Sequence, residues 1–232
     1  MSSQQRSKIV LIGAPPGTGK STIVPPLRHI LHNAKISSQP WIFLDNEWSF
    51  SIQMRKLCSD KSGISLDSPD FVRAFNLRGQ LDYQSLARNL AAQGVNVIMP
   101  GPFEDLTPEV DGMPLYKKMK EKDFGDFDFK AIYVLVHPEK RLSSAEVGGH
   151  PSMVEVEEVI RERLLLRGKG NPVQASLDAD KFGENYYSLR SQKVLRTVEM
   201  FPEIPLVTYP PSPKCSPWDV AYNIFKSTDI WY

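Results

Sequence analysis

Residues 13–22 read Gly-Ala-Pro-Pro-Gly-Thr-Gly-Lys-Ser-Thr, and they follow directly on the apolar run Ile9-Val-Leu-Ile12. The segment from Ala14 to Ser21 fits the pattern of a phosphate-binding loop, with alanine in the place of the opening glycine. This pattern requires a buried strand before the loop and a helix after it, and both are expected here. At average amino-acid frequencies, a chain of this length contains such a match in only about 2% of cases. The stretch therefore predicts a site for the phosphates of a nucleotide.

The residue types in this loop are those that bind phosphate and its counter-ion. Gly17 and Gly19 can adopt positive φ, so consecutive backbone N–H groups can turn toward phosphate oxygens at a helix N-terminus. We expect Lys20 to bridge the β- and γ-phosphates of ATP and the Ser21 hydroxyl to hold Mg²⁺. The alternative is a plain glycine turn between a strand and a helix. The predicted nucleotide-binding residues are Ala14, Pro15, Pro16, Gly17, Thr18, Gly19, Lys20, Ser21 and Thr22.

Outside the loop, short apolar runs alternate with amphipathic stretches, which is typical of strands and helices in turn. The predicted strands are residues 9–12, 41–44, 95–99, 131–136 and 206–209. Buried strands separated by helices indicate an α/β fold, a three-layer α/β/α sandwich with a five-stranded parallel sheet. We expect one P-loop domain over residues 1–232, with a helical lid over about 151–182.

Three local signals refine this layout. Ser216 and Pro217 predict the start of the last helix, with serine as the N-cap and proline in the first helical position. Residues 101–128 are rich in Pro, Gly, Asp and Lys, so we expect an irregular insertion there. Pro25 and Pro26 fall inside the helix that should follow the loop, and we expect a kink or an early break at that point.

Composition limits the possible partners. The 232 residues include 28 Lys plus Arg and 27 Asp plus Glu, a formal charge of +1. That balance gives no broad basic surface for a duplex backbone, which argues against extended nucleic-acid binding. No apolar run is long enough for a membrane span or a signal peptide, so the expected location is the cytosol or another reducing compartment. The sequence leaves the oligomeric state open.

Asp45 stands at the end of the second predicted strand, at the edge where ligands bind in open α/β sheets. A carboxylate there can accept the hydrogen bond of an acceptor hydroxyl and take its proton as the phosphoryl group leaves ATP. The alternative is that Asp45 only caps the segment that follows. Because a phosphate loop is present, we interpret it as the catalytic base.

Arg163 and Arg167 form the second candidate pair. On a helical wheel they fall on the same side as the apolar stripe Val156, Ile160 and Leu164, while Arg161 and Glu162 point away. Two inward guanidinium groups need an anionic partner, and a triphosphate is the natural one in a nucleotide enzyme. The alternative is pairing with glutamates at the helix rim. We interpret both arginines as closing over the triphosphate.

Together these residues resemble the small P-loop kinases of low-molecular-weight substrates, a group that includes gluconate and shikimate kinases, adenylylsulfate kinase, chloramphenicol phosphotransferase and the zeta toxins. Beyond the loop, the resemblance rests on Asp45 and on residues 94–103, 134–138 and 163–168. It implies ATP as phosphate donor, an aspartate of the second strand as base, and lid arginines that close on the phosphates. Residues 100–103 depart from the group because they offer no acidic residue, so Mg²⁺ is expected on Ser21, the nucleotide and water.

The leading functional hypothesis is an ATP- and Mg²⁺-dependent phosphotransferase acting on a hydroxyl of a small molecule, with Lys20, Asp45, Arg163 and Arg167 as its catalytic residues. One alternative enlarges the acceptor to a nucleoside or the end of a polynucleotide. Another is a regulatory module that hydrolyses ATP without a phosphate acceptor. Residues 46–80, where the acceptor should bind, match no named member of the group, so the resemblance does not identify the substrate.

Overall fold

The computed structural model describes most of the chain. The described residues are 6–34, 37–44, 83–101, 103–137, 151–169, 185–211, 215–226 and 229–231, with the backbone alone at 151, 152 and 167–169.

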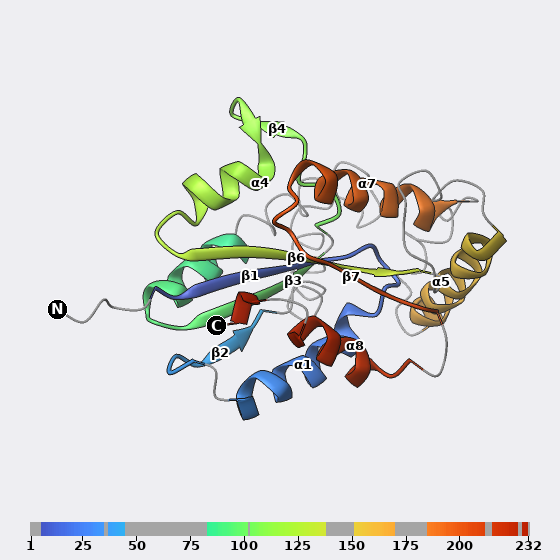
Figure 1. Ribbon diagram of the computed structural model, residues 1–232, viewed down its shortest axis with the longest axis horizontal. Coiled ribbons are helices and arrows are strands. Elements are labelled where there is room, and N and C mark those ends of the chain that lie inside the picture. Colours follow the sequence, from blue (N-terminus) through green and yellow to red (C-terminus); the bar gives the residue numbers. More distant parts are fainter. Residues whose placement is uncertain are drawn as a thin grey trace, which may run out of the picture.

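A five-stranded parallel sheet forms the centre of the molecule, with strand order β2-β3-β1-β6-β7 (Figure 1). The strands are β1 (Lys8–Gly13), β2 (Trp41–Phe43), β3 (Asn96–Gly101), β6 (Asp128–Val136) and β7 (Leu206–Tyr209). Every residue of β1 and β3 is buried, as expected for strands with helices on both faces. Residue Ile9 pairs with Val97 on one side and Phe129 on the other. The predicted parallel sheet is confirmed.

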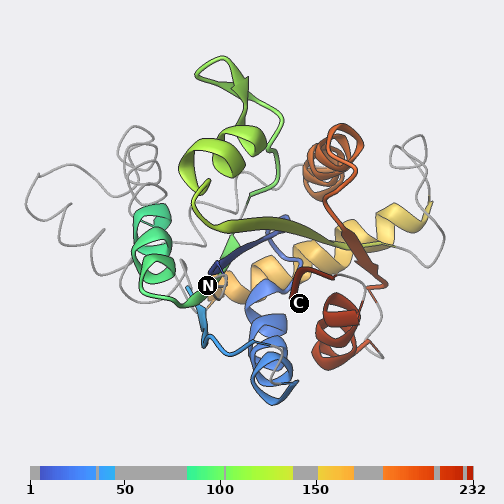
Figure 2. The same ribbon diagram turned by 60° about the vertical axis from the view of Figure 1, so that its left-hand side comes forward.

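Helices cover both faces of this sheet. The longer ones are α1 (Lys20–Ala34), a helix over 83–92, α5 (Pro151–Lys169), α7 (Tyr186–Met200) and α8 (Pro217–Lys226). Helices α1 and α8 lie side by side on one face, α7 lies on the other, and α5 lies beyond the carboxyl ends of the strands (Figures 1 and 2). In the described ranges, no helix combines the length and apolar character that a membrane crossing requires.

Helix α1 runs without interruption through Pro25 and Pro26. Of the kink or early break expected there, the early break is therefore wrong. Each proline removes one intrahelical hydrogen bond. Burial offsets this loss, because one side of the helix packs against the sheet and α8. The buried residues of that side are Ile23, Pro26, Leu27 and Leu31.

Residues 101–128 are also more ordered than the sequence predicts. They contain a hairpin of β4 (Glu109–Val110) and β5 (Met113–Pro114), then α4 (Leu115–Lys118) and a short π-helix, η1 (Met119–Asp123). Asp111 and Gly112 both have positive φ at the hairpin turn, a conformation that an Asp-Gly pair favours. The insertion is therefore a folded element, and the expectation of irregular structure is wrong.

The start of α8 matches the prediction. Ser216 is the N-cap, because its Oγ accepts the backbone N–H of Asp219 at 3.2 Å. In return, the backbone N–H and the hydroxyl of Ser216 donate to the Asp219 carboxylate at 3.0 and 2.7 Å. These hydrogen bonds lower the pKa of Asp219, the side-chain bond being the largest cause.

Candidate functional site

The loop between β1 and α1 has the backbone of an anion cradle. Gly17 and Gly19 have φ of 81° and 84°, which side-chain-bearing residues rarely adopt, so the predicted use of glycine is confirmed. Thr18 braces the turn, since its hydroxyl donates to the Pro15 carbonyl at 2.6 Å. In the described part of the chain, the N–H groups of Gly17, Gly19 and Ser21 donate to no backbone carbonyl. These amides precede or begin α1, where the helix dipole also favours an anion.

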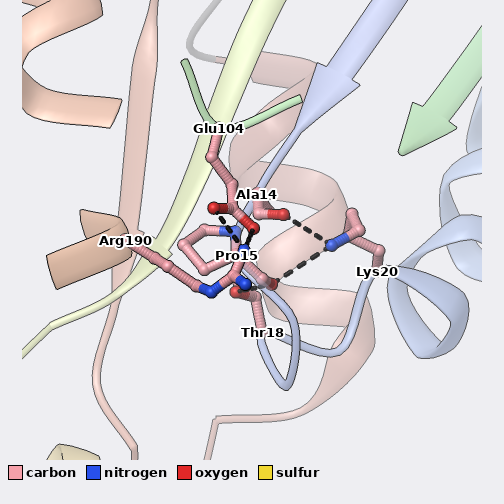
Figure 3. Close-up of polar contacts among 6 residues, drawn as sticks. All are labelled: Ala14, Pro15, Thr18, Lys20, Glu104 and Arg190. Carbon is pink, nitrogen blue, oxygen red and sulfur yellow. Dashed lines mark hydrogen bonds and ion pairs between the residues drawn. The ribbon is translucent and has the colours of Figure 1, made fainter. Parts of the chain in front are cut away.

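The side chain of Lys20 contacts the backbone of this loop. Its Nζ donates to the carbonyls of Ala14 at 2.6 Å and Pro15 at 3.1 Å (Figure 3). The next two side chains, Ser21 and Thr22, are exposed on the first turn of α1. An ammonium beside the loop and an exposed hydroxyl next to it are groups that fit the charge of a triphosphate and a hard cation such as Mg²⁺.

Helix α5 packs directly on the loop. Ile160 and Leu164 are buried, and a methyl group built on Gly17 would lie 2.7 Å from Cγ2 of Ile160 and 3.3 Å from Cγ of Leu164. Between them, Arg163 is half-buried and its Nη1 donates to the Gly17 carbonyl at 3.5 Å, the long limit of a hydrogen bond. The predicted inward stripe, with Arg163 on its side, is confirmed. Arg167 belongs to α5, but its side chain lies outside the described residues.

Two tyrosines reach the same edge of the sheet. The Tyr209 hydroxyl donates to the carbonyl of Thr18. Burial raises the pKa of Tyr209 to about 12, and nearby Arg163 opposes this increase. The Tyr187 hydroxyl accepts the N–H of Val136 at 2.7 Å and donates to the carbonyl of the same residue at 3.2 Å. Neither tyrosine was predicted as a site residue, although Tyr209 stands at the end of a predicted strand, the edge where ligands bind.

An ion pair between a buried glutamate and a half-buried arginine also adjoins the loop. Glu104, which follows β3, is 5% exposed, and Nη1 of Arg190 on α7 donates to its carboxylate oxygens at 2.5 and 2.6 Å. Figure 3 shows the pair beside Pro15, on the side away from Lys20. Arg190 also lies over the ring of Tyr186, 4.5 Å from its centroid. The pair was not predicted: Glu104 lies just beyond residues 100–103, and Arg190 is 86 positions away in the sequence.

One predicted catalytic residue cannot be located in the structure. Asp45, the predicted base, lies outside the described residues. Among the residues that are described, no three His, Cys, Asp or Glu side chains gather into a group that could hold a metal ion. The structure thus brings together the loop, Lys20, Ser21 and Arg163.

Comparisons with known proteins support this reading of the fold. No protein-family model matches the chain, and no curated protein matches it.

Among solved structures, a candidate kinase of Chloroflexus aurantiacus J-10-fl aligns with a TM-score of 0.53 and 13% identity, over 97% of each chain. The fold is the expected three-layer α/β/α sandwich with a parallel sheet. A chain of the PezAT toxin-antitoxin system of Streptococcus pneumoniae aligns with a TM-score of 0.53 and 15% identity, over 98% of this chain and 81% of its own. A fungal RNA kinase aligns more loosely, with a TM-score of 0.41 and 14% identity over 94% and 81%. At these identities the similarity of the first two structures extends to the fold and no further.

Proposed function

We propose that the protein is an ATP- and Mg²⁺-dependent kinase that phosphorylates a hydroxyl group of a small molecule. One observation carries the proposal: the loop after β1 presents the amides of Gly17, Gly19 and Ser21 at the start of α1, with the Lys20 ammonium beside it. This combination is the donor set of a phosphate cradle.

The donor side of the reaction uses the loop. Its amides and Lys20 bind the β- and γ-phosphates of ATP, and Ser21 holds Mg²⁺ through its hydroxyl. Bound Mg²⁺ supplies positive charge that offsets the charge of the phosphates. Arg163, which reaches the loop from α5, and Arg167 on the same helix close over the triphosphate. Catalysis then consists mainly of positioning and charge stabilisation.

The acceptor side requires a base, and Asp45 is the proposed one. The acceptor oxygen attacks the γ-phosphorus, and a new P–O bond forms as the bond from the γ-phosphorus to the β,γ-bridging oxygen breaks. ADP leaves with that electron pair, and the hydroxyl proton passes to the Asp45 carboxylate. The formal charge of +1 fits a small acceptor better than a long nucleic-acid track.

The direct test is a screen of hydroxyl metabolites with labelled ATP, run on the native protein, Lys20→Ala and Asp45→Asn. Lys20→Ala should weaken ATP binding about 10- to 150-fold, the range for a lost hydrogen bond to a charged group. Asp45→Asn should bind ATP almost normally but lose about 10²- to 10⁴-fold in turnover, as expected for a missing general base. The control is Lys117→Ala, which alters an exposed lysine of α4.

Each role has its own contradicting result. Unchanged ATP affinity in Lys20→Ala removes the nucleotide site, and undiminished turnover in Asp45→Asn removes the base. Slow ATP consumption that no hydroxyl compound accelerates identifies a nucleotide-dependent regulatory module instead of a kinase.

A further inference from the structure

Tyr209, the last residue of β7, connects the sheet to the phosphate loop. Its ring is buried, with 8% of the residue exposed, and its hydroxyl donates to the carbonyl of Thr18. Its backbone is fixed independently of the loop, because it pairs with Val136 of β6 and its carbonyl accepts the N–H of His137 at 2.7 Å. The position of the hydroxyl is therefore set by the sheet.

This hydrogen bond determines which way one peptide unit of the loop faces. The carbonyl of Thr18 and the N–H of Gly19 belong to the same peptide plane, and in a trans peptide they point in opposite directions. The described residues contain no cis peptide bond. Fixing the Thr18 carbonyl on Tyr209 therefore turns the Gly19 N–H away from Tyr209. The Gly19 carbonyl, which belongs to the next peptide unit, accepts the N–H groups of Thr22 and Ile23 at 2.9 and 3.0 Å and connects Gly19 to α1.

We infer that Tyr209 is a positioning residue for phosphate binding, which holds the Thr18–Gly19 peptide so that the Gly19 amide faces the bound phosphates. The inference rests on the proposed function in one respect, that the loop binds a nucleotide. Its physical basis is preorganisation: an amide that is already oriented needs no rearrangement when the anion arrives.

The chemistry of the hydroxyl suits this role. Because the pKa of Tyr209 is raised to about 12 by burial, the phenol keeps its proton at neutral pH and remains a donor. Arg163 lies close enough to oppose that increase, and it also reaches the Gly17 carbonyl. The carbonyls of Gly17 and Thr18, which belong to consecutive peptide units, thus accept hydrogen bonds from Arg163 of α5 and from Tyr209 of β7.

The test compares Tyr209→Phe with the native protein in calorimetric titrations with two probes, Mg²⁺–ATP and Mg²⁺–inorganic triphosphate. Loss of one hydrogen bond predicts that both probes bind about 2- to 13-fold more weakly, and by the same factor. Inorganic triphosphate carries no base or ribose, so this probe reports on the phosphate cradle alone. The matched control is Tyr116→Phe, which removes a hydroxyl from a tyrosine of α4 that is 2% exposed.

Equal weakening for both probes, with unchanged affinity in Tyr116→Phe, supports the inference. Native-like triphosphate affinity in Tyr209→Phe overturns it and leaves the proposed function standing, and weakening for ATP alone overturns it by indicating a contact with the nucleoside. If the native protein binds neither probe, the proposed function fails and the inference fails with it. Should Tyr209→Phe unfold at 25 °C, the titrations are made at about 10 °C with trimethylamine N-oxide, an osmolyte that stabilises folded proteins.

Discussion

Gly17 is the point at which the phosphate loop meets α5, and Gly17→Ala tests how closely the two are packed. The new methyl has two separate effects. It requires a side-chain-bearing residue at φ 81°, which costs about 1–2 kcal/mol. It also approaches Cγ2 of Ile160 to 2.7 Å and Cγ of Leu164 to 3.3 Å, and overpacking of this kind costs about 1–3 kcal/mol. The expected loss in free energy of unfolding is therefore about 2–5 kcal/mol.

Gly19→Ala is the matched control, because it separates the two effects. Gly19 has nearly the same φ, 84°, but the nearest atom to its added methyl is the Tyr209 hydroxyl oxygen at 3.6 Å, an ordinary contact. The free energy of unfolding of Gly19→Ala should therefore fall only by the cost of the positive φ, about 1–2 kcal/mol. The difference between the two variants, measured by urea unfolding at 25 °C, is the energy of the contact with α5.

A double-mutant cycle with Ile160→Ala identifies the partner. The single substitution should cost about 2–5 kcal/mol, because Ile160 is 1% exposed and its removal leaves a cavity. In the double variant the clash is gone, so the combined loss should fall short of the sum by about 1–3 kcal/mol. Equal losses for Gly17→Ala and Gly19→Ala, or additivity within about 0.5 kcal/mol, would refute the packing of α5 on the loop.

Two further predictions concern helix starts. Glu157 of α5 accepts the N–H groups of Tyr187 and Ser188, in the first turn of α7, at 3.0 and 2.6 Å. Glu157→Ala should therefore lower the free energy of unfolding by about 0.5–2 kcal/mol, while Glu158→Ala, at an exposed position of α5, should leave it unchanged. Because the pKa of Asp219 is lowered in the folded state by its bonds to Ser216, its stabilising contribution is present above its unfolded pKa of about 4 and is lost as pH falls through the folded value. Chemical unfolding of native protein and Asp219→Asn should therefore differ at neutral pH and converge in acid; a constant difference contradicts the assigned role.

The central strands could be predicted because their burial makes them continuous apolar runs. Where burial alternates, prediction was less accurate. Strand β6 begins at Asp128, three residues before the predicted start at 131. The prediction missed these residues because Asp128 and Lys130 stand on either side of buried Phe129 and interrupt the apolar run. The stripe of α5 was predictable for the same reason as the strands: its inward residues are aliphatic.

Helix α7 could not be predicted from hydrophobic periodicity. Its buried side includes the hydroxyl residues Ser188, Ser191 and Thr197, so the pattern of apolar residues does not mark the inward face. The pair of Glu104 and Arg190 was hidden for another reason. Its members are 86 positions apart, and only the tertiary fold brings them together beside the loop.

The strand order has a consequence for how the chain folds during synthesis. Strand β1 is made first but lies between β3 and β6, which are made much later. At about 5–20 residues per second, roughly 6–25 s separate the completion of β1 from that of β6. Until β3 is complete β1 has neither of its neighbours, and until β6 is complete it still lacks one of them. Parallel pairings between distant segments form slowly and leave such strands open to aggregation. The apolar residues of β1, all buried in the folded protein, are therefore exposed on the nascent chain until its neighbouring strands have been made. We expect the nascent chain to bind chaperones that recognise extended apolar segments.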